Sequence, residues 1–110
     1  MTVAAAIVIL GGFAVAFIAL LGRSGKLPRN RFAGIRTPST LRSDAAWDVA
    51  HRVSWAYTLV SGVGMVILGV VLSLKPRSDV ALGVLLLSLV PILIGAAKGD
   101  RAARAIVDPQ

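Results

Sequence analysis

The chain of 110 residues contains no cysteine, a single histidine and few charged side chains, which make up 15% of its residues. Without cysteine there is no disulfide framework, no thiolate nucleophile and no cysteine metal site. Soluble domains carry roughly 25% charged residues and about 45–50% apolar ones. Here the hydrophobic share is 56% and the mean hydropathy is +0.82. These values indicate a membrane protein, with residues 1–110 forming one membrane domain.

Charged residues are absent from three apolar runs, and each run is long enough to cross a bilayer. A transmembrane helix needs about 20 apolar residues, within a range of about 17–25, and a backbone in lipid must satisfy its own hydrogen bonds. The runs therefore predict an all-α protein with three membrane spans, at residues 3–21, 57–74 and 80–97. No basic segment precedes the first run, so we expect a span there and not a cleaved signal peptide.

Acidic residues are also scarce, because 12 Lys and Arg stand against five Asp and the net charge is +7. A basic balance can indicate nucleic acid, but these side chains lie between apolar runs, where they set topology and contact anionic lipid headgroups. Ten of them fall in the first loop and the C-terminal segment, and two fall in the second loop. Positive residues stay cytoplasmic, so we predict an outside N-terminus and a cytoplasmic C-terminus.

A helix is predicted to start near Ser39 or Ser43, and from residue 43 it should run unbroken to residue 74, because neither glycine nor proline interrupts the chain between Ser39 and Gly62. Ser43 can cap this helix, and Asp44 suits its positive end. Pro28 and Pro38 favour extended backbone in the residues that precede them, so residues 30–37 should be irregular or extended and not helical. Such a helix is about 48 Å long and exceeds the bilayer core of about 30 Å. Its first part must protrude, tilt or bend along the interface.

Small residues recur at four-residue spacing in the first two spans. Small side chains let membrane helices approach closely, although glycine and alanine are also common in membrane helices generally. The small-residue stripes are Gly12 and Ala16 in the first span, and Ser54, Thr58 and Gly62 in the second helix.

The third span contains Pro91, which predicts a kink, and residues 75–79 predict a tight hairpin before it.

Asp44, Asp48 and His51 are spaced by four and three residues, so their side chains can converge on one helix face. Two carboxylates and an imidazole can bind a divalent cation or relay protons. In the alternative, Asp44 serves the helix start, Asp48 pairs with Arg52, and His51 lies at the membrane interface. Three ligands from one helix rarely complete a coordination sphere, so we predict no metal and no cofactor. No motif for nucleophilic catalysis or phosphate binding is present, which argues against an enzyme.

Aromatic and basic residues border this polar helix start. Trp55 and Tyr57 should lie at the headgroup level, where such side chains are enriched, and Trp47 can stack on His51 or on a nearby arginine. Arg36 can clasp a carboxylate or a phosphate with its planar fork. Its ligand could be a lipid headgroup, a partner protein or the chain's own carboxylates. We predict that acceptors near residues 44–51 hold it.

The stretch NRFAGIRTPSTLRSDAAWDVAHR, residues 30–52, resembles the signature of the SdpI-like family of bacterial membrane immunity proteins. The resemblance covers the motif-bearing, three-span half of such a protein. It implies a non-enzymatic protein of the bacterial plasma membrane that protects the envelope against a toxic peptide or signals through a partner. The matching positions include Ile35, Thr40 and Ser43. Ligand or partner binding is expected at Asn30, Gly34, Arg36, Thr37, Pro38, Asp44, Trp47, Asp48, His51 and Arg52.

A second class of function stays open beside this one. The chain could be a small accessory subunit of a larger membrane complex, in which its spans fill a lipid-facing groove. Expected partners are thus anionic lipids, a protein or peptide, or further copies of the chain, and not nucleic acid. An accessory subunit should co-purify in fixed stoichiometry with a large complex.

Overall fold

Three long helical rods make up most of the computed structural model, which describes residues 2–30, 32–75 and 78–106. All three rods are long and apolar enough to cross a membrane. The described residues contain no strand, so the predicted all-α fold with three spans is confirmed. The elements are α1 (Val3–Ser24), the short α2 (Pro38–Leu41), α3 (Asp44–Leu74), and a third rod divided into α4 (Ser78–Ser88) and α5 (Val90–Arg104).

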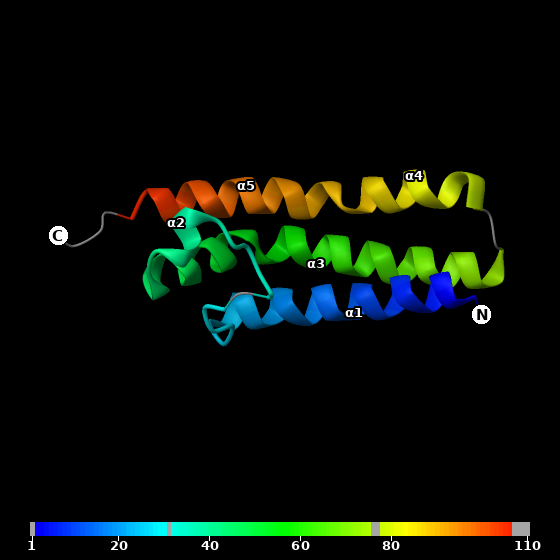
Figure 1. The fold of residues 1–110 in the computed structure, drawn as a ribbon, viewed down its shortest axis with the longest axis horizontal. Coiled ribbons are helices and arrows are strands. Elements are labelled where there is room, and N and C mark those ends of the chain that lie inside the picture. Colours follow the sequence, from blue (N-terminus) through cyan, green and yellow to red (C-terminus); the bar gives the residue numbers. More distant parts are fainter. Residues whose placement is uncertain (1, 31, 76–77, 107–110) are drawn as a thin grey trace.

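The central rod is α3, which lies between the other two (Figure 1). It packs against α1 on one side and against α4 and α5 on the other, and within the described ranges α1 and α5 do not come into contact. The molecule is accordingly an elongated layer, with principal extents of 56 × 22 × 20 Å. Because the two outer rods stay apart, part of the surface of α3 is left uncovered between them.

The length of α3 follows the prediction. The helix runs without a break from Asp44 to Leu74, and the Ser43 hydroxyl caps it by accepting a hydrogen bond from the Ala46 amide at 3.1 Å. The described part of residues 30–37 is free of helix and strand, as expected. The first three turns of α3 thus extend beyond the apolar run that begins at Tyr57, and they carry most of the candidate site.

Small residues bring α1 and α3 into backbone contact. A Cβ atom added to Gly12 would lie 2.7 Å from the Gly62 carbonyl oxygen, and one added to Gly62 would lie 2.7 Å from the Ala16 amide nitrogen. The predicted close-packing role of these three residues is confirmed. Close approach of this kind is how membrane helices gain packing energy where lipid removes the hydrophobic driving force.

A second small-residue stripe, which the sequence interpretation missed, packs α5 against α3. It consists of Gly95, Gly99 and Ala103, all buried. A Cβ atom added to Gly99 would lie 2.8 Å from the Ala50 carbonyl oxygen, and one on Gly95 would lie 2.7 Å from the Tyr57 Cβ atom. The third helix therefore continues well past the apolar run that ends at residue 97, and its basic last turns accompany the start of α3.

The predicted kink at Pro91 is present as a break in the third rod at Leu89. Proline has no amide hydrogen and clashes with the preceding turn. Beyond the break, the amide of Ile92 donates a 2.9 Å hydrogen bond to the hydroxyl of Ser61, a fully buried side chain of α3. The kink is thereby anchored to the central helix. The predicted hairpin at residues 75–79 includes 76–77, which lie outside the described residues.

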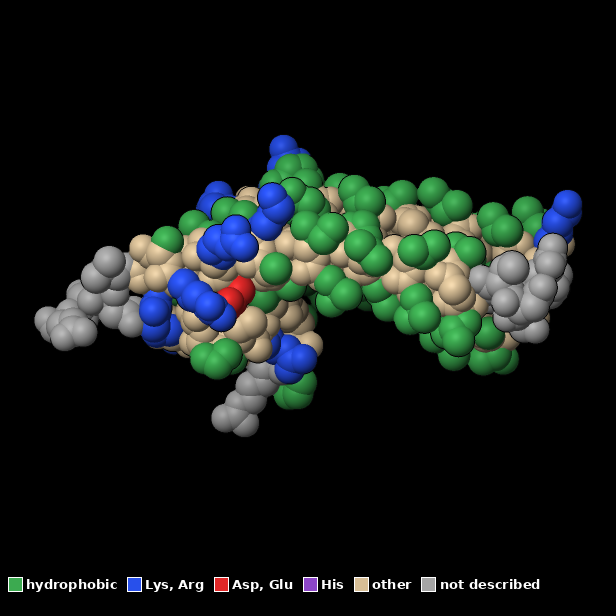
Figure 2. Space-filling model, turned by 90° about the horizontal axis from the view of Figure 1, so that it is seen from above, with side chains coloured by type: hydrophobic (Ala, Val, Ile, Leu, Met, Phe, Trp, Pro, Cys, Tyr) green, Lys and Arg blue, Asp and Glu red, His purple; other side chains and the backbone are tan. Residues whose placement is uncertain are grey.

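Charge is distributed unevenly along the molecule. Figure 2 shows basic side chains gathered toward one end and hydrophobic side chains covering the rest of the visible face. Among the described residues, Lys75 is the basic side chain of the opposite end. We call the basic end the polar head and define it as residues 25–55 together with 95–106. The described basic residues at or beside it are Arg23, Lys26, Arg29, Arg36, Arg42, Arg52, Lys98, Arg101 and Arg104.

Candidate functional site in the polar head

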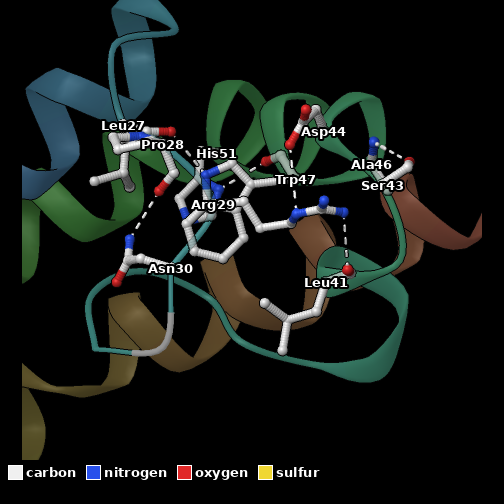
Figure 3. A network of polar contacts seen from close by, with 10 residues as sticks. All are labelled: Leu27, Pro28, Arg29, Asn30, Leu41, Ser43, Asp44, Ala46, Trp47 and His51. Carbon is white, nitrogen blue, oxygen red and sulfur yellow. Dashed lines mark hydrogen bonds and ion pairs between the residues drawn. The ribbon is translucent and has the colours of Figure 1, made fainter.

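The loop after α1 is shaped by Asn30. Its side-chain oxygen accepts hydrogen bonds from the amides of Phe32 and Ala33, both at 2.8 Å, and its amide nitrogen donates to the Pro28 carbonyl at 2.8 Å (Figure 3). Asparagine commonly organises turns in this way, because its side chain imitates a backbone group. The predicted site residue Asn30 thus has a local role, which is to fold the loop back over the start of α3.

Trp47 holds the beginning of this loop. Its indole nitrogen donates a 2.8 Å hydrogen bond to the Leu27 carbonyl, and the side chain is almost fully buried (Figure 3). The indole also contacts the imidazole of His51, with ring centroids 4.3 Å apart and planes tilted by 39°. The expected contact between Trp47 and His51 is therefore confirmed.

His51 fastens the middle of the loop. Its Nδ1 atom lies 2.7 Å from the Trp47 carbonyl oxygen, and its Nε2 atom accepts a hydrogen bond from the Ile35 amide at 2.9 Å. Since a carbonyl can only accept and an amide can only donate, these two partners assign a neutral imidazole with its proton on Nδ1. Protonation at Nε2 would remove the acceptor for Ile35 and release the loop.

His51 lies on the polar face of the helix, and only 5% of the residue is exposed. Its expected place at the membrane interface stays a prediction. The loop and α1 cover that face. Burial lowers the pKa of the His51 imidazole below its ordinary value of 6.5, outweighing the Trp47 carbonyl and Asp48, which act in the opposite direction. His51 precedes the apolar run at 57–74.

Glycine is required at position 34 for two reasons. Its φ angle is +102°, in the region that other residues rarely adopt. In addition, a Cβ atom there would lie 2.6 Å from His51 Nε2 and 3.1 Å from the Trp47 ring. The glycine therefore lets the loop backbone come close enough for the neighbouring Ile35 amide to reach the imidazole.

The far end of the loop is fixed by two threonines. Thr37 and Thr40 form a capping box around α2: the Thr37 hydroxyl accepts from the Thr40 amide at 3.2 Å, and the Thr40 hydroxyl accepts from the Thr37 amide at 2.9 Å. Pro38 occupies the first turn of α2, where it leaves no hydrogen bond unmade. The Thr40 hydroxyl then donates to the Ile35 carbonyl at 2.7 Å.

This end of the loop is also tied to α5. The Thr37 hydroxyl donates to the carboxylate of Asp100, which pairs with Arg104 at 2.8 Å. The guanidinium of Arg42 donates to the carbonyls of Ala103 at 2.8 Å and Ile106 at 2.7 Å, satisfying the C-terminal end of α5. Asp100 was missed as a site residue, because 63 positions separate it from Thr37 and no local pattern connects them.

The two carboxylates of the motif do not converge with His51. Asp44 pairs with Arg29 at 3.4 Å, and Asp48 pairs with Arg52 at 2.7 Å. The alternative in which Asp48 bonds Arg52 is confirmed. Across the described ranges there is no group of three side chains with metal-binding chemistry. Arg29 also donates to the Leu41 carbonyl at 3.1 Å, joining the loop to α2 (Figure 3).

Cations from the outer helices cover the two aromatic residues expected at the headgroup level. The Arg23 guanidinium lies 4.7 Å from the Trp55 ring centroid, and the Lys98 ammonium lies 5.6 Å from that of Tyr57. Such contacts are attractive through the ring quadrupole. Both side chains bring positive charge to the level where the polar head meets the apolar rods.

A cavity of about 450 Å³ lies beneath the loop, between α1 and α5. Loop residues 32–37 form its roof, and α3 forms its floor with His51, Ser54 and Thr58 among others. Arg36 lines the cavity and also interacts within the protein. That its acceptors lie near residues 44–51 stays a prediction.

Together, the fold and the site define a multi-pass helical membrane protein with a structured polar head at one end. The model of the SdpI/YfhL protein family matches residues 26–97, and the chain belongs to this family. The matched segment contains every predicted site residue, from Asn30 to Arg52, whereas Asp100 lies beyond it. No curated protein and no solved structure matches the chain.

Proposed function

We propose that the chain resides in the bacterial plasma membrane with its N-terminus outside and its polar head at the cytoplasmic face. There it protects the envelope against a toxic peptide or signals through a partner protein, without catalysing a reaction. Family membership supports an immunity-type role, and the basic head supports the orientation, because positive residues favour the cytoplasmic side.

The observation that carries this proposal is that the motif residues hold the loop in place through hydrogen bonds. Thr37, Trp47 and His51 bond to other parts of the head and so present one ordered loop surface. At the tip of that surface, Phe32 is 90% exposed. A large apolar side chain on a basic loop suits contact with a partner or a lipid more than chemistry, because exposed aromatic residues often anchor interfaces.

In-cell photo-crosslinking tests this proposal. A photoreactive amino acid at Phe32 should capture a discrete protein or peptide, whereas the same probe at Leu74, which is 77% exposed at the opposite end, should not capture that species. Cells that lack the chain should also be several-fold more sensitive to secreted membrane-active peptides, and the wild-type chain should restore resistance. No capture at Phe32 together with unchanged sensitivity to every peptide would refute the proposal.

The uncovered surface of α3 between α1 and α5 favours a second candidate, an accessory subunit of a larger membrane complex. A neighbouring protein could fill that gap. Purification in mild detergent separates the two candidates, because an accessory subunit should elute with a large complex in fixed stoichiometry. Elution as a small species would exclude this candidate and leave the first one standing.

A further inference from the structure

We propose that the cavity beneath the loop binds one anionic phospholipid, with an acyl chain between α1 and α5 and its phosphate beside Arg36. This inference rests on membrane insertion and not on the proposed protective role. Figure 2 shows the outline of the molecule stepping inward where the basic end meets the apolar body.

The walls of the cavity are apolar and open toward lipid. Because α1 and α5 are not in backbone contact, the cavity between them stays partly open at the molecular surface. Bilayer lipid can therefore enter laterally, without passing through water. The wall residues are Val15, Ile18 and Ala19 of α1, and Ile92, Leu93 and Ala96 of α5.

The cavity spans two environments. Its floor runs from His51, which precedes the apolar run, to Thr58, which lies in the first turn of that run. This distance corresponds to about 10 Å along a helix. One end of an occupant therefore lies beside the polar groups of the head, and the other end lies between apolar side chains of α1 and α5 such as Val15 and Ile92, so the occupant must be amphiphilic.

The charge around the cavity selects an anion. Among the described residues that line it, Arg36 is the charged one and none carries a carboxylate. Arg36 already interacts within the protein, but a guanidinium has five N–H donors and can serve a phosphate as well. Arg23 adds a second cation, because it lies over the Trp55 ring, which also lines the cavity.

The size of the cavity fits part of one lipid. Its volume of about 450 Å³ lies within the range of about 300–1,000 Å³ that is usual for small-molecule sites. The remainder of the lipid can stay in the surrounding leaflet, where the exposed ring of Phe32 borders the same opening. The site therefore holds a single lipid and does not enclose it.

Native mass spectrometry of the full chain, released from detergent, tests the proposal with phosphatidylglycerol and phosphatidylcholine of identical acyl chains. We expect one phosphatidylglycerol per chain and a preference over phosphatidylcholine. Each basic group beside an anionic headgroup contributes about fivefold. Arg36→Gln should therefore reduce the preference about fivefold, whereas Arg101→Gln, which removes the same charge elsewhere on the head, should not.

A steric pair of variants locates the lipid. Ala96→Phe fills the cavity from its α5 wall, whereas Ala97→Phe places the same ring on the next residue, which is exposed and does not line the cavity. Only Ala96→Phe should abolish the bound lipid. Should Ala96→Phe fail to fold, as judged by circular dichroism, the Arg36→Gln comparison still decides.

Three results would overturn the proposal. Equal retention of both lipids would show that charge does not select the occupant. Equal effects of the two phenylalanine variants would show that lipid binds elsewhere. Dimers of the chain that Ala96→Phe dissociates would show that a second copy, and not a lipid, fills the cavity.

Discussion

Replacing Gly34 by alanine should undock the loop. The positive φ angle of 102° costs roughly 1–2 kcal/mol for a residue with a side chain. The new Cβ atom would lie 2.6 Å from His51 Nε2, so the loop must move and the hydrogen bond from Ile35 must lengthen or break. Losing that bond costs about 0.5–1.5 kcal/mol. The free energy of loop docking should therefore fall by about 1.5–3.5 kcal/mol.

Amide hydrogen exchange at Ile35 measures this loss, because the amide is protected only while the loop is docked. Since about 1.4 kcal/mol corresponds to a factor of 10, exchange should accelerate about 10- to 300-fold. Gly83→Ala is the matched control, because nothing lies within 4 Å of the added Cβ atom in α4, and it should leave exchange at Ile35 unchanged. Equal protection in wild type and Gly34→Ala would refute the close approach of loop and imidazole.

Three further predictions concern pH, the arginine fork and topology. Burial lowers the His51 pKa below 6.5, so the imidazole binds a proton more readily when the loop is undocked. Loop docking should therefore weaken as pH falls from about 7 to about 5. Exchange at Ile35, corrected for its intrinsic rate, should rise over this range, and His51→Gln should abolish the dependence. Arg36→Lys keeps the charge but loses the planar fork, so it should impair peptide resistance nearly as much as Arg36→Ala while insertion stays normal; full activity would make Arg36 a topology charge only. Single cysteines at Thr2 and Ser78 should react with an impermeant thiol reagent from outside, whereas those at Ser24 and Gln110 should not. The reverse pattern would overturn the orientation.

The parts of the fold that depend on local patterns could be predicted from the sequence. Hydropathy located three spans, Ser43 marked the start of α3, and four-residue spacing identified the packing surface around Gly62. Each of these signals acts within a few turns of helix. The ion pair between Asp48 and Arg52 is local in the same sense, because the two residues are four positions apart on one helix.

The parts that depend on distant segments could not be predicted. His51 looks like a residue of a polar face until the loop covers it, and only the loop conformation, set by Asn30 and Gly34, decides that. The stripe from Gly95 to Ala103 lies partly within a charged segment, so hydropathy assigned its end to a tail. Asp100 joins the site through Thr37, which is remote in sequence.

A neutral, buried His51 docks the loop onto α3. Nitrogen NMR of the full chain in lipid nanodiscs, with the imidazole labelled, tests this most directly. At neutral pH we expect a proton on Nδ1, an unprotonated Nε2, and a scalar coupling between Nε2 and the Ile35 amide across their hydrogen bond. A proton on Nε2, or an imidazolium, would contradict it.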